Sequence, residues 1–289
     1  MSVKDLKQTV LITGAGGFIG GHLLKQAAEA GFNAFGTCNL SEKGGLILLD
    51  ITNKSQVESV IKKIAPDVII HCAALSNAGH CVKDKELAKA VNIGGTKNIA
   101  LAAQKINAHL IYISTDLVFD GKKGNYSEND TPAPICFYGQ TKFDGENEVL
   151  KVNKDFTIAR LSWVYGRTVN NAKNYLDILI SDLEQKKSVN LFYDEYRSPV
   201  FIDDVCNALL ELAANKESGV FHLTGGHKMS RLDFGNKVCE QLGFDKSLIV
   251  KTSSDIISGL EKRPKDCSLL SNKIINKSVK FKSVEEGIK

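Results

Sequence analysis

Short, continuously apolar runs separated by helix-length segments are the feature of this chain that most restricts its fold. Most of these runs lack the apolar–polar alternation of a half-exposed strand. Strands that are apolar on both faces are typical of a parallel sheet covered by helices on both sides. The strand candidates are Val10–Thr13, Ala34–Cys38, Leu46–Asp50, Asp67–Cys72, Leu110–Ser114, Thr157–Leu161 and Val220–Leu223.

The segments between the runs are long enough for helices, and this alternation predicts a doubly wound α/β fold. The helix candidates are Gly20–Ala30, Lys54–Ile64, Lys85–Lys105, Tyr138–Lys151 and Val205–Ala214. The alternation weakens after Trp163, since Asn170–Lys187 looks helical but no further unit of the same kind follows it. We therefore expect a smaller lobe over the carboxyl ends of the strands, where open α/β sheets bind their ligands.

The composition is that of an ordinary globular protein, with 43% hydrophobic and 24% charged residues. The net charge is +4 and the basic residues are scattered, which argues against nucleic-acid binding. No apolar stretch approaches the roughly 20 residues of a membrane span, and the first residues lack a signal-peptide core. The seven cysteines lack metal-type spacing. We expect a reduced, cytoplasmic protein with no metal site and no membrane partner.

A glycine-rich turn follows the first apolar run, with glycines at Gly14, Gly17 and Gly20. In a dinucleotide-binding turn, the first glycine allows the tight turn, the second lets the backbone approach a pyrophosphate, and the third lets helix and strand pack closely. The helix that follows supplies unpaired N–H groups for phosphate oxygens. The position between the first strand and the first helix favours this interpretation over a plain structural loop.

The dinucleotide fingerprint also expects an acid about 20 residues further on, at the end of the second strand. That strand ends in Thr37–Leu40, which contains neither a carboxylate for the ribose of NAD nor an arginine for the 2′-phosphate of NADP. Lys43 either reaches the 2′-phosphate or is a solvated loop residue. Asp50 ends the third run and either meets the adenine or caps the following helix.

Tyr138 and Lys142 are four positions apart, so a helix would place them on one face. An unperturbed tyrosine, with a pKa near 10, is a poor base at neutral pH. A nearby ammonium favours the phenolate, so we expect Lys142 to lower the pKa of Tyr138 and also to hold a nicotinamide ribose. The alternative is an ordinary surface pair on an amphipathic helix.

Polar residues follow the central strand candidate Leu110–Ser114, beginning with Thr115 and Asp116. A hydroxyl at this position can bind the substrate oxygen that Tyr138 would protonate. The alternative for these residues is a simple turn and helix cap. Asn92 lies within a predicted helix, where asparagine is not intrinsically favoured. It either bends the helix and carries a water-linked proton path to Lys142, or faces solvent.

Six segments spread over nearly the whole chain resemble the extended short-chain dehydrogenase/reductase superfamily, and within it the dTDP-4-dehydrorhamnose reductase family. They are Thr13–Gly20, Asp67–Ala74, Ile113–Gly121, Tyr138–Glu146, Arg160–Gly166 and Lys262–Leu269. The resemblance implies a Rossmann fold with a smaller C-terminal substrate lobe. Residues 1–165, with about 199–225, would form the NAD(P)-binding domain, and residues 166–198 and 226–289 the lobe.

The resemblance also implies a role for individual residues. Tyr138 would be the proton donor, Lys142 its partner, and Thr115 the hydroxyl that tunes it. The substrate, a nucleotide sugar, would be lined by Thr115, Asp116, Trp163 and Arg263. The cofactor, NADP(H) or NAD(H), would be bound by Gly14, Gly17, Phe18, Ile19, Gly20, Asp50, Ile51, Ala73, Ala74, Leu75, Asn92, Ile113, Tyr138 and Lys142.

One segment departs from the family pattern. Family members often carry Asp-Gln-x-Gly-x-Pro-Thr where this chain has Asp194–Val200, so Arg197 replaces the glycine and Val200 the threonine. The continuation, Phe201–Val205, also resembles sugar-nucleotide epimerases and dehydratases. The identities of the sugar and of the nucleotide are therefore left open.

Three functions remain compatible with the sequence. The first is reduction of the C4 carbonyl of a 4-keto-6-deoxy nucleotide sugar by NADPH or NADH. The second is an epimerase or dehydratase that retains its NAD, although a dehydratase would want further acids and Leu117, not Glu, follows Asp116. The third is a non-catalytic dinucleotide-binding subunit, like the regulatory subunit of methionine adenosyltransferase. We favour the reductase, and a homodimer is compatible with it.

Overall fold

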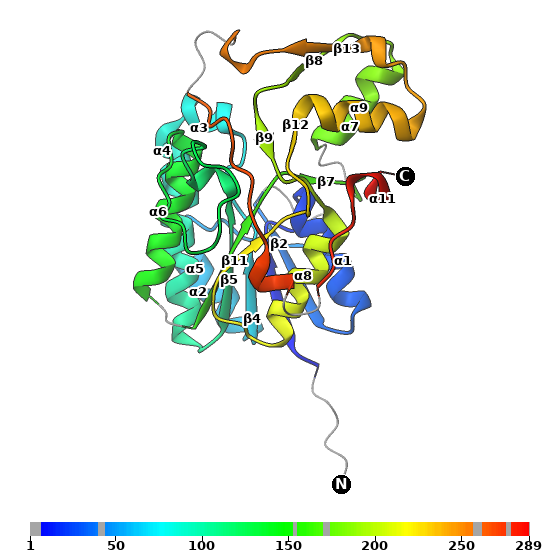
Figure 1. Ribbon diagram of the computed structural model, residues 1–289. Helices are drawn as coiled ribbons and strands as arrows, with labels where there is room; N and C mark the ends of the chain where they lie inside the picture. The colour runs from blue at the N-terminus through cyan, green and yellow to red at the C-terminus, as the bar shows by residue number, and fades with distance from the viewer. Residues whose placement is uncertain are drawn as a thin grey trace.

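The centre of the molecule is a seven-stranded parallel sheet with strand order β11-β6-β5-β4-β1-β2-β3 (Figure 1). The computed structural model describes residues 7–39, 44–152, 155–169, 174–256, 262–275 and 279–288. The strands are β1 (Thr9–Thr13), β2 (Asn33–Cys38), β3 (Ile47–Leu48), β4 (Val68–His71), β5 (His109–Thr115), β6 (Phe156–Leu161) and β11 (Gly219–Leu223). Every predicted strand belongs to this sheet, so the doubly wound α/β fold is confirmed.

Helices cover both faces of the sheet (Figure 1). One face packs against α1 (Phe18–Glu29) and α8 (Ile202–Ala214), and the other against α2 (Lys54–Ile64), α5 (Thr96–Lys105) and α6 (Phe137–Val152). Along β1, Val10 and Ile12 enter the first core, whereas Leu11 enters the second. Alternate side chains of a strand point to opposite faces, so a strand buried on both faces has to be apolar throughout.

The helix predicted over Lys85–Lys105 is interrupted. It consists of α4 (Lys85–Lys89), a π-helical turn η1 (Ala90–Gly95) and α5, and it is preceded by a short helix α3 (Ala78–Lys83) that was not predicted. A π-helical turn widens the backbone ladder and is frequently found at functional sites. Here it contains Asn92, which is completely buried.

Most of the remaining elements form a smaller lobe above the carboxyl ends of the strands, at the top of Figure 1. They are β7 (Val164–Tyr165), α7 (Tyr175–Glu184), β8 (Val189–Phe192), β9 (Tyr196–Arg197), β10 (Val200–Phe201), β12 (Met229–Ser230), α9 (Arg231–Leu242), β13 (Ile249–Thr252) and α11 (Val284–Gly287). The short helix α10 (Asn272–Ile275) instead packs against β11, with Ile274 in the core of the sheet. The helix expected within Asn170–Lys187 is α7, while residues 170–173 lie outside the described part. Leu176, Phe234 and Val284 share a separate apolar core.

No helix in the described ranges has the length and apolar character needed to cross a membrane. The same ranges contain no group of three or more His, Cys, Asp or Glu side chains that could hold a metal ion.

The close packing of α1 on β1 leads to a first prediction. A Cβ atom at Gly20 would overlap the carbonyl oxygen of Gly14 and would lie 2.9 Å from the Cα of Ala15. We expect Gly20→Ala to lower the free energy of unfolding by about 1–3 kcal/mol, because backbone atoms have to move. Gly226→Ala is the control, since a Cβ there would meet nothing within 4 Å. Urea unfolding checks the difference, and equal stability of the two variants would contradict it.

Candidate active site

The glycine turn joins β1 to α1 at the carboxyl edge of the sheet. Gly14 has a φ of +70°, and a Cβ there would lie 2.7 Å from the amide nitrogen of Ala73. The N–H of Gly17 donates to the carbonyl of Gly14 at 2.9 Å, which closes the turn. In the described structure the first turn of α1 has no side-chain cap and no acidic residue. Such a helix start fits the pyrophosphate of a dinucleotide, which Phe18 and Ile19 would meet.

The segment after β4 is fixed by Asn92. Its Oδ1 accepts from the N–H of Leu75 at 2.8 Å, and its Nδ2 donates to the carbonyl of Leu75 and to Thr141 Oγ1 at 3.1 and 3.0 Å. Asn92 therefore does not face solvent. It ties Ala73–Leu75 to the residue that precedes Lys142, which brings two predicted cofactor-binding segments together.

Asp50 and Ile51 follow β3, which pairs with β2. The Oδ1 atom of Asp50 accepts from the backbone N–H and the hydroxyl of Thr52 at 2.9 and 2.7 Å. The cap of α2 is instead Asn53, which accepts from the N–H of Gln56. The helix-cap interpretation of Asp50 is therefore wrong, because the helix begins one turn later. Lys43 lies outside the described residues.

Tyr138 and Lys142 lie one turn apart on α6, close to the end of β5. A Cβ at Gly139 would overlap the carbonyl oxygen of Leu117, so this glycine allows α6 to approach the segment after β5. The Nζ atom of Lys142 lies 4.2 Å from the ring centroid of Tyr112, and the side chain is buried. Burial lowers the pKa of Lys142 to about 7, because the charged form loses its hydration.

The prediction that Lys142 lowers the pKa of Tyr138 is wrong for this structure. Burial raises the pKa of Tyr138 well above its usual value, and the nearby Cys81 and Asp116 raise it further. The Lys142 ammonium lies over the ring of Tyr112 instead. The phenol of Tyr138 consequently keeps its proton at neutral pH, which suits a proton donor better than a base.

Thr115 and Asp116 form a buried polar group at the end of β5. The Thr115 hydroxyl donates to Asp116 Oδ1 at 3.1 Å and accepts from the N–H of Leu117, so the turn-and-cap interpretation also holds. Ser162 donates to Asp116 Oδ2 at 3.1 Å, and Arg197 Nε lies 3.6 Å from the same oxygen. Burial raises the pKa of Asp116, while Arg197 and the hydroxyl donors act against the rise. Ile113, two residues before Thr115, is buried in the same strand.

Trp163 and Arg263 lie on the lobe side of the site and are joined by two residues whose roles were not predicted. The guanidinium of Arg231 lies 4.7 Å from the Trp163 ring and 5.0 Å from the Tyr175 ring. Glu195, which is buried, pairs with Arg231 at 3.3 Å and with Arg263 at 2.5 Å. The only sequence signal was the acid at position 195, where the family pattern has glutamine. Two arginines and an indole ring can bind a diphosphate and a base.

A further buried ion pair, also not predicted, lies behind the site. Arg160 binds both carboxylate oxygens of Glu146, at 2.9 and 2.7 Å, and the Ser114 hydroxyl donates to Glu146 at 2.5 Å. Glu146 follows Lys142 by one helical turn, so the spacing on α6 was a usable signal. The pair joins the helix that carries Lys142 to the strand that ends in Thr115.

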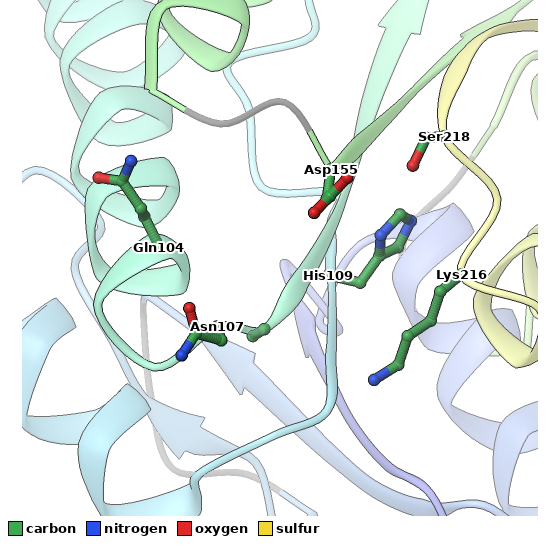
Figure 2. A pocket seen from close by; sticks show the side chains of 7 residues that line it. Gln104, Asn107, His109, Asp155, Lys216 and Ser218 are labelled. Atoms are coloured by element: carbon green, nitrogen blue, oxygen red, sulfur yellow. The ribbon is translucent and has the colours of Figure 1, made fainter.

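Figure 2 shows a cavity of about 270 Å³ at the opposite edge of the sheet. His109, Asp155 and Ser218 lie at the amino ends of β5, β6 and β11, and the rest of the lining is Gln104, Asn107, Ala108 and Lys216. The polar residues described above follow the carboxyl ends of the strands, so this cavity is not part of the candidate site.

A family model described as the RmlD substrate binding domain matches residues 8–289. The chain belongs to this family. It is therefore a member of the dTDP-4-dehydrorhamnose reductase family within the extended short-chain dehydrogenases/reductases, as its motifs predicted. A crystal structure of dTDP-4-dehydrorhamnose reductase from Bacillus anthracis, in complex with NADP, is 30% identical with a TM-score of 0.89 and covers 98% of each chain.

Curated relatives of this RmlD-family chain differ in what they do. It is 33% identical to a probable low-salt glycan biosynthesis reductase of Haloferax volcanii, Agl14, over 90% of this chain and 89% of that protein. It is also 29% identical to methionine adenosyltransferase 2 subunit beta of Rattus norvegicus, over 94% of this chain and 84% of that protein. Membership of the family therefore leaves both a reductase and a regulatory subunit open.

The buried Glu146–Arg160 pair leads to a second prediction. Glu146→Ala would leave a buried guanidinium without its carboxylate, and we expect the free energy of unfolding to fall by about 3–5 kcal/mol. Glu148→Ala, on the same helix, removes ion pairs with the exposed Lys151 and Lys97 and should cost about 1 kcal/mol or less. Urea unfolding of both variants measures the difference. Equal losses would contradict the structural role of the Glu146 pair.

Proposed function

We propose that this RmlD-family chain is an NAD(P)H-dependent reductase of the C4 carbonyl of a 4-keto-6-deoxy nucleotide sugar. The main support is Tyr138, a half-buried phenol whose pKa is raised by burial and which lies near Asp116 at the end of the central strand, with Lys142 one turn away. A proton donor next to a dinucleotide crevice is the arrangement that carbonyl reduction requires.

The dinucleotide, when bound, supplies the hydride for the reduction. Tyr138 Oη gives its proton to the carbonyl oxygen of the sugar. The phenolate that remains would recover a proton from Lys142, one helical turn away, whose pKa of about 7 lets it release a proton near neutral pH. The residues that would hold NADP(H) or NAD(H) are Gly14, Gly17, Phe18, Ile19, Gly20, Asp50, Ile51, Ala73, Ala74, Leu75, Asn92 and Ile113.

The nucleotide sugar would lie between the sheet edge and the lobe. Asp116 would face the sugar, while Trp163, Arg231 and Arg263 would face the diphosphate and the base. We propose residues 1–165 with 199–225 as the cofactor-binding domain, and residues 166–198 and 226–289 as the substrate lobe. Holding both reactants in one crevice supplies part of the rate by fixing their orientation.

A regulatory subunit is the second candidate, because the similarity to methionine adenosyltransferase 2 subunit beta extends over 94% of this chain. In that case the crevice would bind a dinucleotide without turnover, and the partner would be a protein. The presence of Thr115, Tyr138 and Lys142 together favours the reductase.

The third prediction tests the proton donor with a panel of 4-keto nucleotide sugars and either NADPH or NADH. We expect Tyr138→Phe to lower kcat on the order of 10²–10⁴-fold, because a general acid is removed. Cofactor affinity should be unchanged. Tyr193→Phe is the control, since that side chain is 41% exposed.

Three results would contradict the proposal. No cofactor oxidation with any member of the panel argues against a reductase. Co-purification with a protein partner whose binding is insensitive to Tyr138→Phe indicates a regulatory subunit. Tightly retained NAD in the purified protein, detected by absorbance, indicates an epimerase or dehydratase.

A further inference from the structure

Arg197 stands where the family pattern has a glycine, and its side chain is 7% exposed. Its Nη1 atom donates to the carbonyl of Tyr196 at 2.7 Å, and its Nη2 atom donates to the carbonyl of Pro264 at 3.2 Å. These bonds fix the plane of the guanidinium against β9 and the segment around Pro264. The Nε atom is the part of the group that lies next to Asp116.

Asp116 receives three contacts from three different parts of the chain. Arg197 Nε and the Ser162 hydroxyl approach Oδ2 at 3.6 and 3.1 Å, and the Thr115 hydroxyl donates to Oδ1 at 3.1 Å. A buried carboxylate stays ionised only where a charge or several donors compensate for its lost hydration. An ionised carboxylate accepts hydrogen bonds only.

We propose that Arg197 is a positioning residue that keeps Asp116 an acceptor, so that the hydrogen of the Thr115 hydroxyl stays committed to Asp116. Thr115 Oγ1 then has one remaining lone pair, because it also accepts from the N–H of Leu117. A lone pair at this place binds a hydroxyl hydrogen of the sugar. In a 4-keto-6-deoxy sugar, C3 is the neighbour of the carbonyl that carries a hydroxyl. The site therefore selects a sugar with a free C3 hydroxyl, an inference that rests on the proposed function.

The fourth prediction has one arm that does not depend on turnover. The carboxyl of Asp116 is titrated by ¹³C NMR in the wild type, Arg197→Met and Arg197→Lys, with its resonance identified by its absence in Asp116→Asn. The other groups near Asp116 are Arg231 of α9, Tyr138 of α6 and Cys267. Loss of the cation adds to the effect of burial, so the titration midpoint should rise in Arg197→Met. In Arg197→Lys it should stay near the wild-type value.

The second arm compares a 4-keto nucleotide sugar with its C3-deoxy analogue. We expect the wild type to prefer the hydroxylated sugar on the order of 100-fold or more in kcat/KM, because a buried acceptor is left unpaired by the analogue. In Arg197→Met this preference should fall at least tenfold, whereas Arg197→Lys should retain it. Thermal unfolding shows whether each variant folds. If Arg197→Met does not fold, the comparison of Arg197→Lys with the wild type is the test.

The outcomes separate this inference from the proposed function. An unchanged midpoint in a folded Arg197→Met overturns the link between Arg197 and Asp116. A shifted titration midpoint of Asp116 with an unchanged preference for the hydroxylated sugar overturns the selection of the C3 hydroxyl. A wild type that oxidises no cofactor contradicts the reductase, while the titration still tests whether Arg197 holds Asp116 ionised.

Discussion

The parallel direction of the strands is the constraint on which the rest of this structure depends. Because every strand of the central sheet runs the same way, their carboxyl ends meet at one edge. The register places Thr115 of β5 opposite Leu161 of β6, and β4 leads into Ala73 on the other side of β5. The parallel sheet alone therefore brings residues that are far apart in the chain close together at this edge.

Burial of this edge under the lobe decides how its charges are arranged. Two arginine–carboxylate pairs lie on either side of Thr115: Arg160 with Glu146 behind the strand, and Arg197 with Asp116 at its end. A buried carboxylate without a partner would be strongly destabilising, so each acid that turns inward requires a basic residue from another element. The carboxyl end of β5 is held from two directions as a result.

Much of the sheet could be predicted because strands buried on both faces leave continuous apolar runs in the sequence. The strands of the lobe could not be predicted, because elements such as β9 and β12 span two residues each and show no periodicity. The raised pKa of Tyr138 also escaped prediction, because burial is a property of the folded chain. The contacts of Arg197 escaped for the same reason, since its partner Pro264 is 67 positions away.

The core of the lobe has a consequence for how the molecule is made. Leu176, Phe234 and Val284 belong to one apolar cluster, which Ile288 completes near the end of the chain. Contacts between such distant positions form late, because a long stretch of chain has to be ordered first. The core of the sheet depends on the same part of the chain, since Ile274 is buried in it and Phe281 packs against it. The segment that contains Ile274, Phe281 and Val284 therefore joins the sheet to the lobe, and neither core is complete before this segment has been synthesised.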